Sequence, residues 1–248
     1  MGMPDQETAA AMAGLSAEAH RLLDNPIWHS LRTEHAGIAL GDGRARRYPS
    51  SIGPLSGIPE QSEENYAALA ALATEDILVL FSLEPYRLPL GWTEMRTFDL
   101  VQMVRVKPPS EEGTGRGAAQ QMRRLTPDDA PAMVDLARLT EPGPFRLSTL
   151  ELGGFYGIFH GEQLVSMAGR RMHLPGLIEV SAVCTHPDVR GRGHARRLMT
   201  HVIEEIEREG KTAFLHAFKQ NPAIGLYERL GFRIRQTFQG AVFKPRPA

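Results

Sequence analysis

A glycine-rich turn between a predicted strand and a predicted helix is the segment best suited to chemistry. The turn is Arg190-Gly-Arg-Gly193; an apolar run at residues 177–185 comes before it, and a long amphipathic segment begins directly after it. Glycines let the backbone come close to a ligand, and a helix N-terminus adds about half a positive charge. The segment therefore predicts a turn that binds phosphate or pyrophosphate.

Two familiar nucleotide sites do not match this turn. A P-loop needs Lys followed by Ser or Thr, and His194 and Ala195 stand there instead. A dinucleotide-binding turn lies early in a βαβ unit and is followed by an acid about 20 residues later. This turn lies late in the chain, and no residue fills the role of that acid. A tight connecting turn with solvated arginines remains the structural alternative.

A second patterned segment begins at Asn221 and reads Asn221-Pro-Ala-Ile-Gly-Leu-Tyr-Glu-Arg-Leu-Gly-Phe232. Asn followed by Pro is typical of a helix start. Tyr227 falls on the same predicted helix face as Ala223 and Leu230, so it is suited to packing, to chemistry, or to both.

Together the two segments resemble motifs of the GNAT superfamily of N-acetyltransferases. Arg190-Gly-Arg-Gly193-His-Ala195 is similar to the motif that binds the pyrophosphate of acyl-CoA, and the segment from Asn221 to Phe232 is similar to the signature that carries a tyrosine. The resemblance covers residues 118–244. It implies a mixed α/β sheet with the GNAT acyltransferase fold. The overall layout also resembles the branch in which a degenerate copy of the fold precedes the active one, as in glycine N-acyltransferase-like proteins.

The resemblance further implies a binding site for acetyl-CoA as co-substrate. Main-chain groups of the strand before the turn would pair with the pantetheine arm, and the turn with the start of the helix would hold the pyrophosphate. The expected binding residues are Val183, Cys184, Thr185, Arg190, Gly191, Arg192, Gly193, His194, Ala195, Arg196 and Asn221. Cys184 is also open to interpretation as a small core residue or as a nucleophile.

Two catalytic residues are implied in the same way. Glu179 lies four residues before Val183, where several family members have a general-base glutamate. Tyr227 matches the tyrosine that protonates the leaving thiolate. Such groups matter because a lysine-like amine has a pKa near 10.4 and a thiol a pKa of about 8.5. For Glu179, a surface or ion-paired strand residue is the structural alternative.

The chain divides at residues 108–117, which contain no apolar residue and read as a flexible linker. We therefore expect a degenerate GNAT-like domain at 1–107 and the catalytic GNAT domain at 118–248, with each side owning a core. Helices are expected from Thr126, from Ala195 and from Asn221. Strands are expected at 155–159, 164–168, 177–185, 212–217, 233–237 and 241–243 in the second half, and at 36–40, 45–48, 77–82 and 98–106 in the first, which also has a helix at 62–73.

Composition excludes several classes of protein. The 28 Lys and Arg residues against 29 Asp and Glu give a formal net charge of −1, so the basic excess of a nucleic-acid-binding protein is missing. The single cysteine rules out a zinc site built from several thiolates, and the histidines lack metal-ligand spacing, so no metal is expected. The most apolar stretch, 77–83, is too short for a bilayer, which needs about 20 residues. A soluble cytoplasmic protein without a membrane partner is expected, and a homodimer stays open.

The sequence thus predicts an N-acetyltransferase that moves an acetyl group from acetyl-CoA to a primary amine by direct transfer. Glu179 and Tyr227 favour this enzyme over a non-catalytic acyl-CoA-binding regulatory module, which would not need both. The acceptor pocket is expected to involve residues 141–150, the loop 172–176 and the N-terminal half. Its ligand stays open between a small amine, an amino acid, an antibiotic and a protein N-terminus.

Overall fold

The computed structural model describes residues 14–73, 76–106 and 122–246. The predicted linker at 108–117 lies outside these ranges. The helices are α2 (Ala17–Asp24), α3 (Pro26–Arg32), α4 (Glu63–Leu72), α5 (Ala130–Thr140), α6 (His194–Arg208) and α7 (Ile224–Arg229), with short 3-10 turns η1 (Pro127–Asp129), η2 (Leu147–Leu152) and η3 (Pro187–Val189).

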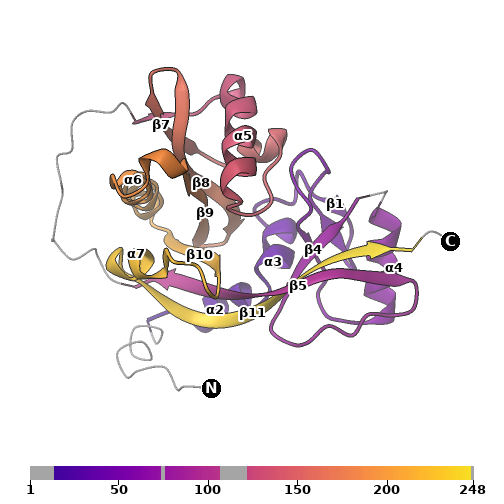
Figure 1. Ribbon diagram of the computed structural model, residues 1–248. Coiled ribbons are helices and arrows are strands. Elements are labelled where there is room, and N and C mark those ends of the chain that lie inside the picture. Colours follow the sequence, from indigo (N-terminus) through magenta and orange to yellow (C-terminus); the bar gives the residue numbers. More distant parts are fainter. Residues whose placement is uncertain (1–13, 74–75, 107–121, 247–248) are drawn as a thin grey trace.

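One large sheet organises the chain (Figure 1). Its eight strands follow the order β4-β11-β5-β10-β9-β8-β7-β6, and only the β9–β10 pair is parallel. Their bounds are β4 Leu78–Ser82, β5 Trp92–Arg105, β6 Met122–Arg124, β7 Phe155–His160, β8 Gln163–Leu174, β9 Leu177–Thr185, β10 Thr212–Phe218 and β11 Phe232–Pro245. A small second sheet joins β1 (Leu40–Gly41), β2 (Arg46–Arg47) and β3 (Ser56–Gly57). The predicted mixed α/β sheet is confirmed.

The two halves of the chain share this sheet. Strand β5, which precedes the linker, lies between β10 and β11, with Met103 opposite both Leu215 and Ile234. In return, the end of β11 pairs with β4. One buried cluster likewise combines Leu23 and Tyr48 from the first half with Phe214 from the second. Among the described residues, the two halves are therefore joined by strands of one sheet and by a common hydrophobic core.

Helices α5 and α6 cover opposite faces of β8 and β9. Helix α6 is amphipathic and buries Leu198, Val202 and Ile206 in the cluster that also contains Ile178 of β9. Helix α5 packs Met133 and Leu136 into a different cluster. These helices hold β9, the strand that leads into the glycine turn, from both sides.

Most expected elements are found, with several differences. Strand β5 begins at Trp92 instead of Phe98, and β8 continues to Leu174 instead of ending at Ala168. The strand expected at 36–40 is reduced to β1, and the two short strands expected at 233–237 and 241–243 form the single strand β11. Helices α2 and α3 are not among the expected elements. A register shift between Ile234 and Gln236 interrupts the pattern of side-chain alternation there. In the described ranges, no helix is long and apolar enough to cross a membrane. Nor do these residues include three or more His, Cys, Asp or Glu side chains grouped as a metal site would require.

Candidate active site

Strands β9 and β10 separate at the centre of the sheet. They pair at three positions, Leu177 with Thr212, Ile178 with Ala213 and Glu179 with Phe214, and no further. Beyond Glu179, β9 continues beside β8, while β10 continues beside β5 as far as Phe218. The sheet is thereby opened between its two central strands, and the edge of β9 on this side is left for another partner.

A β-bulge in β9 marks the same place. Between Met167 and Gly169 the strand β8 advances two residues, while β9 advances three, from Cys184 to Ser181. The extra residue lies at Ala182, whose backbone is left-handed with φ of 52°. Before the bulge, Ile178 and Val180 face α6; after it, Ala182 and Cys184 pack with α5. The bulge therefore switches the side chains of β9 to the other face of the sheet.

Strand β9 leads directly into the glycine turn. Gly191 and Gly193 both have φ of 78°, in the left-handed region that side chains disfavour, and Gly193 is the N-cap of α6. An added Cβ would meet nothing within 4 Å at either position, so backbone conformation rather than crowding requires glycine. The first turn of α6 contains no acidic residue. Its N–H groups and the helix dipole are suited to an anion.

The predicted binding residues cluster around this turn. Arg190 is exposed and its Nε donates to the Thr185 carbonyl oxygen at 3.3 Å. His194 is buried, and its Nε2 atom has no hydrogen-bond partner among the described residues. Burial, together with Arg192 and Arg197, lowers the pKa of His194, so its ring is neutral near pH 7. Cys184 packs in the core beside α5, and burial raises the pKa of its thiol to about 11, which fits a small core residue better than a nucleophile.

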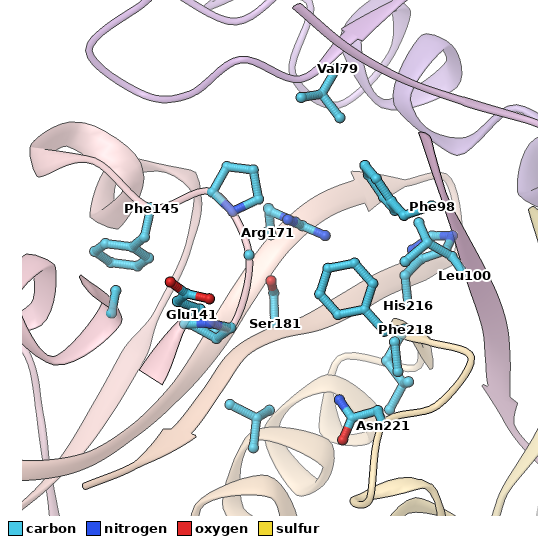
Figure 2. Close-up of a pocket in the computed structure, with 18 of the residues that line it drawn as sticks. Val79, Phe98, Leu100, Glu141, Phe145, Arg171, Ser181, His216, Phe218 and Asn221 are labelled. Atoms are coloured by element: carbon cyan, nitrogen blue, oxygen red, sulfur yellow. The ribbon is translucent and has the colours of Figure 1, made fainter. Parts of the chain in front are cut away.

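The opening between β9 and β10 continues into a cavity of about 450 Å³ (Figure 2). Val180, Ser181, Ala182 and Val183 of β9 line one side. Strands of the N-terminal half contribute Val79, Phe81, Arg96, Phe98 and Leu100, and the loop after α5 contributes residues 141–145. The acceptor pocket expected at residues 141–150 and the N-terminal half thus coincides in part with this cavity. The loop 172–176 does not line it; Pro175 and Gly176 line a separate hollow of about 230 Å³.

Tyr227 and Asn221 both reach this cavity. Tyr227 is 5% exposed, packs in the cluster with Leu230 and also lines the cavity, so the packing and site interpretations hold together. Burial raises the pKa of its hydroxyl to about 12. The Oδ1 atom of Asn221 accepts a hydrogen bond from the Ala223 N–H at 2.8 Å, which supports the turn into α7.

Glu179 is fully buried and contacts Arg171 and His216, which line the cavity. Arg171 donates to both carboxylate oxygens, from Nε at 2.7 Å and from Nη2 at 2.8 Å, and His216 Nδ1 lies 2.8 Å from Oε1. Burial by itself raises the pKa of Glu179, but Arg171 and His216 outweigh it and lower the pKa to about 2. Such a carboxylate is a weak base, so the general-base role that the sequence predicts for Glu179 does not suit this arrangement.

The second ring nitrogen of His216, Nε2, also has a hydrogen-bond partner, Gln102. Gln102 Oε1 accepts from Arg235 Nη1 at 2.8 Å, so its Nε2 atom is the donor to Leu23 O at 2.9 Å and to His216 Nε2 at 3.1 Å. His216 Nε2 is therefore an acceptor, and its Nδ1 carries the proton donated to Glu179. This buried network ties the cavity wall to α2 of the N-terminal half.

Replacing Glu179 with glutamine is expected to lower the free energy of unfolding by about 3–5 kcal/mol at neutral pH, because it leaves the buried Arg171 charge uncompensated. The folded-state pKa lies below the unfolded value of about 4.3, so this contribution is present above pH 4.3 and is lost as the pH falls toward 2. Chemical denaturation at several pH values measures it. Glu209→Gln, which removes the half-exposed partner of Arg170, is the control and should cost far less. Equal losses would contradict the buried-pair account.

Sequence reasoning missed several cavity residues. Arg171 and His216 hold Glu179, and Phe81 and Phe98 come from the other half of the chain. The sequence offers one signal for Arg171: it is a charged residue within a mostly apolar strand, β8, and Glu179 is an oppositely charged residue within the adjacent apolar strand, β9.

Comparison with known proteins assigns the chain to a family. The model of the FR47-like protein family matches residues 155–239. A putative acetyltransferase of the GNAT family from Novosphingobium aromaticivorans is 34% identical and has a TM-score of 0.79, with 91% of this chain and 99% of that chain covered. This chain therefore belongs to the GNAT family. No curated protein matches it.

More distant structures share the fold. A GCN5-related N-acetyltransferase from Kribbella flavida is 15% identical, with a TM-score of 0.58 and 92% and 95% of the two chains covered. A Drosophila protein is also 15% identical, with a TM-score of 0.59 and 99% and 98% covered. At these identities the likeness concerns architecture alone.

Proposed function

We propose that this protein is an acetyl-CoA-dependent N-acetyltransferase that transfers the acetyl group directly to a primary amine. One observation carries the proposal: the separation of β9 from β10 beside the bulge at Ala182, which connects the glycine turn to the cavity. Similarity to GNAT acetyltransferases supports acetyl transfer as the reaction class.

The residues around the separation suit acetyl-CoA. Backbone N–H groups from Gly191 to Arg196 would hold the pyrophosphate, because the two left-handed glycines and the acid-free helix start favour an anion. At Val183, Cys184 and Thr185, the edge of β9 that faces away from β8 has no pairing with β10, and its main chain would hydrogen-bond the pantetheine arm as a neighbouring strand does. Asn221, which lines the cavity, would contact the same arm.

The reaction then needs one bond exchange and two proton movements. The neutral amine nitrogen attacks the thioester carbon, the C–N bond forms, and the C–S bond breaks to release the thiolate. The amine gives its proton to solvent or to a group in the cavity. Tyr227 is the proposed donor to the thiolate, because its side chain lines the cavity beside the opening and its hydroxyl is protonated at neutral pH.

Glu179 has a positioning role in this proposal. Its carboxylate orients Arg171 and His216, which line the cavity, and does not itself contact the acceptor. The N-terminal half, proposed as a degenerate GNAT-like domain at 1–107, supplies part of the acceptor wall through Phe81, Arg96 and Phe98. The catalytic domain is proposed at 118–248, as a unit whose sheet is completed by β5 of the first half.

Incubation with acetyl-CoA and a library of primary amines tests the function. We expect mass spectrometry to detect an N-acetylated product that also identifies the acceptor. Tight acetyl-CoA binding without any acetylated amine would favour the alternative, a non-catalytic acyl-CoA-binding module.

Tyr227→Phe is expected to lower the rate of acetyl transfer by about 10²-fold while acetyl-CoA affinity changes little. The substitution keeps the ring that packs with Leu230 and removes only the hydroxyl. Single-turnover measurement isolates the chemical step from product release. Tyr156→Phe, which removes a hydroxyl bonded to Glu205 away from the cavity, is the matched control and should retain activity. Equal single-turnover rates for Tyr227→Phe and the parent protein would remove the donor role.

A further inference from the structure

The described residues contain two non-glycine residues with left-handed backbone, and both line the cavity. One is Ala182 at the bulge, and the other is Glu141, with φ of 49°. Glu141 is the C-cap of α5, and its N–H donates to the Ala137 carbonyl oxygen at 2.8 Å. Glycine is usual at such a helix end, since a side chain is disfavoured there. Retained strain of this kind often accompanies function.

Glu141 is the one acidic residue among those that line the cavity. Figure 2 shows its side chain on the wall formed by the loop after α5, across the cavity from Phe98 and Phe218. Its side chain is exposed, and none of the described residues forms an ion pair with it. Glu179, the other carboxylate nearby, is fully engaged by Arg171 and His216.

The remaining charges of the cavity are positive. Arg96 of β5 stacks on Phe98 and Phe218 at 5.6 and 5.9 Å from the ring centroids. Arg138 of α5 and Arg171 of β8 complete the set, and the lowered pKa of His216 leaves that ring neutral at pH 7. An amine acceptor arrives largely as an ammonium ion, because such amines have a pKa of about 8 to 10. Arg171 is paired with Glu179 and Arg138 with Asp135, so Glu141 is the one side chain lining the cavity whose charge would attract the acceptor.

We propose that Glu141 is the carboxylate that binds the acceptor's ammonium group and holds the nitrogen beside the opening between β9 and β10. The inference rests on the proposed function, since it assigns a residue for the acceptor of that reaction. Binding of the ammonium group is distinct from the proton donation proposed for Tyr227 and from the positioning role proposed for Glu179. Glu141 acts here as a binding and specificity residue, and the amine loses its proton after docking.

Steady-state kinetics of Glu141→Gln with the acceptor from the amine library tests the assignment. We expect KM for the acceptor to rise by about 10- to 100-fold, the range of a lost charged hydrogen bond, with kcat within a few-fold of the parent value. KM for acetyl-CoA should be unchanged. The KM defect should shrink as the pH rises above the acceptor's pKa, because the amine is then uncharged. Glu151→Gln, an exposed glutamate outside the cavity, should behave as the parent does.

Glu141→Gly separates binding from folding. Glycine removes the left-handed strain, so the melting temperature should stay the same or rise while the acceptor KM defect persists. An unchanged acceptor KM in Glu141→Gln, or a defect independent of pH, would overturn the inference while leaving the acetyltransferase function in place. If the parent protein acetylates no amine, the proposed function fails, and this inference fails with it.

Discussion

Gly193→Asp is expected to weaken acetyl-CoA binding by at least about 10²-fold while the protein stays folded. The aspartate would place a carboxylate at the N-cap of α6, where the pyrophosphate is proposed to approach the backbone. Two like charges at close range repel strongly, and the anion also loses contact with the first-turn N–H groups. Folding should survive, because an added Cβ meets nothing within 4 Å and aspartate is tolerated in the left-handed region better than most residues.

The matched control lies at the other end of the same helix. Gly210 has φ of 70° and also has open space around it, so Gly210→Asp adds the same side chain in the same backbone conformation. Isothermal titration with acetyl-CoA should show near-normal affinity for this control. Undiminished affinity in Gly193→Asp, or equal losses in both variants, would remove the pyrophosphate site from the α6 turn.

Residues 118–248 expressed alone are expected to show no cooperative thermal unfolding transition. Strand β5 would be missing, so β10 and β11 would lose their shared neighbour along nearly their whole length. Unpaired strand edges and exposed apolar side chains then favour aggregation; Phe214, for example, would lose its packing with Leu23 and Val104. Circular dichroism during heating measures the transition.

The control for this truncation is the full chain cut at an engineered protease site within residues 108–117. Both halves are then present, and we expect the cut protein to melt as one cooperative unit. A cooperative transition in residues 118–248 alone would contradict the view that the strands exchanged between the halves are essential for folding.

Local sequence patterns are sufficient to predict much of the secondary structure around the active site. The apolar run at 177–185 is strand β9 as expected, and the glycine turn and the start of α6 follow it. These features depend on neighbours in sequence, namely glycines, an amphipathic repeat and a helix N-terminus. The place of β5 between β10 and β11 depends on pairing between residues more than a hundred positions apart, such as Met103 with Leu215. No local signal reports such pairing.

For the site residues too, local sequence patterns indicate some features, while others depend on contacts between distant parts of the chain. Glu179 stands out in the sequence as an acid within an apolar strand, but its role depends on Arg171 across the β8–β9 hairpin and on His216 from β10. Glu141 has no local signature, because its left-handed backbone is imposed by the turn that ends α5. Its proposed role depends on the cavity, which brings Glu141 together with Arg138 of α5, Arg96 of β5 and Arg171 of β8.

Release of free coenzyme A thiol from acetyl-CoA, measured with and without the amine found by library screening, tests the central claim most directly. We expect slow release from acetyl-CoA alone, and amine-dependent release that matches the acetylated product mole for mole. Tyr227→Phe should reduce the amine-dependent rate. Saturable acetyl-CoA binding with release that no amine accelerates would contradict acetyl transfer and leave an acyl-CoA-binding module.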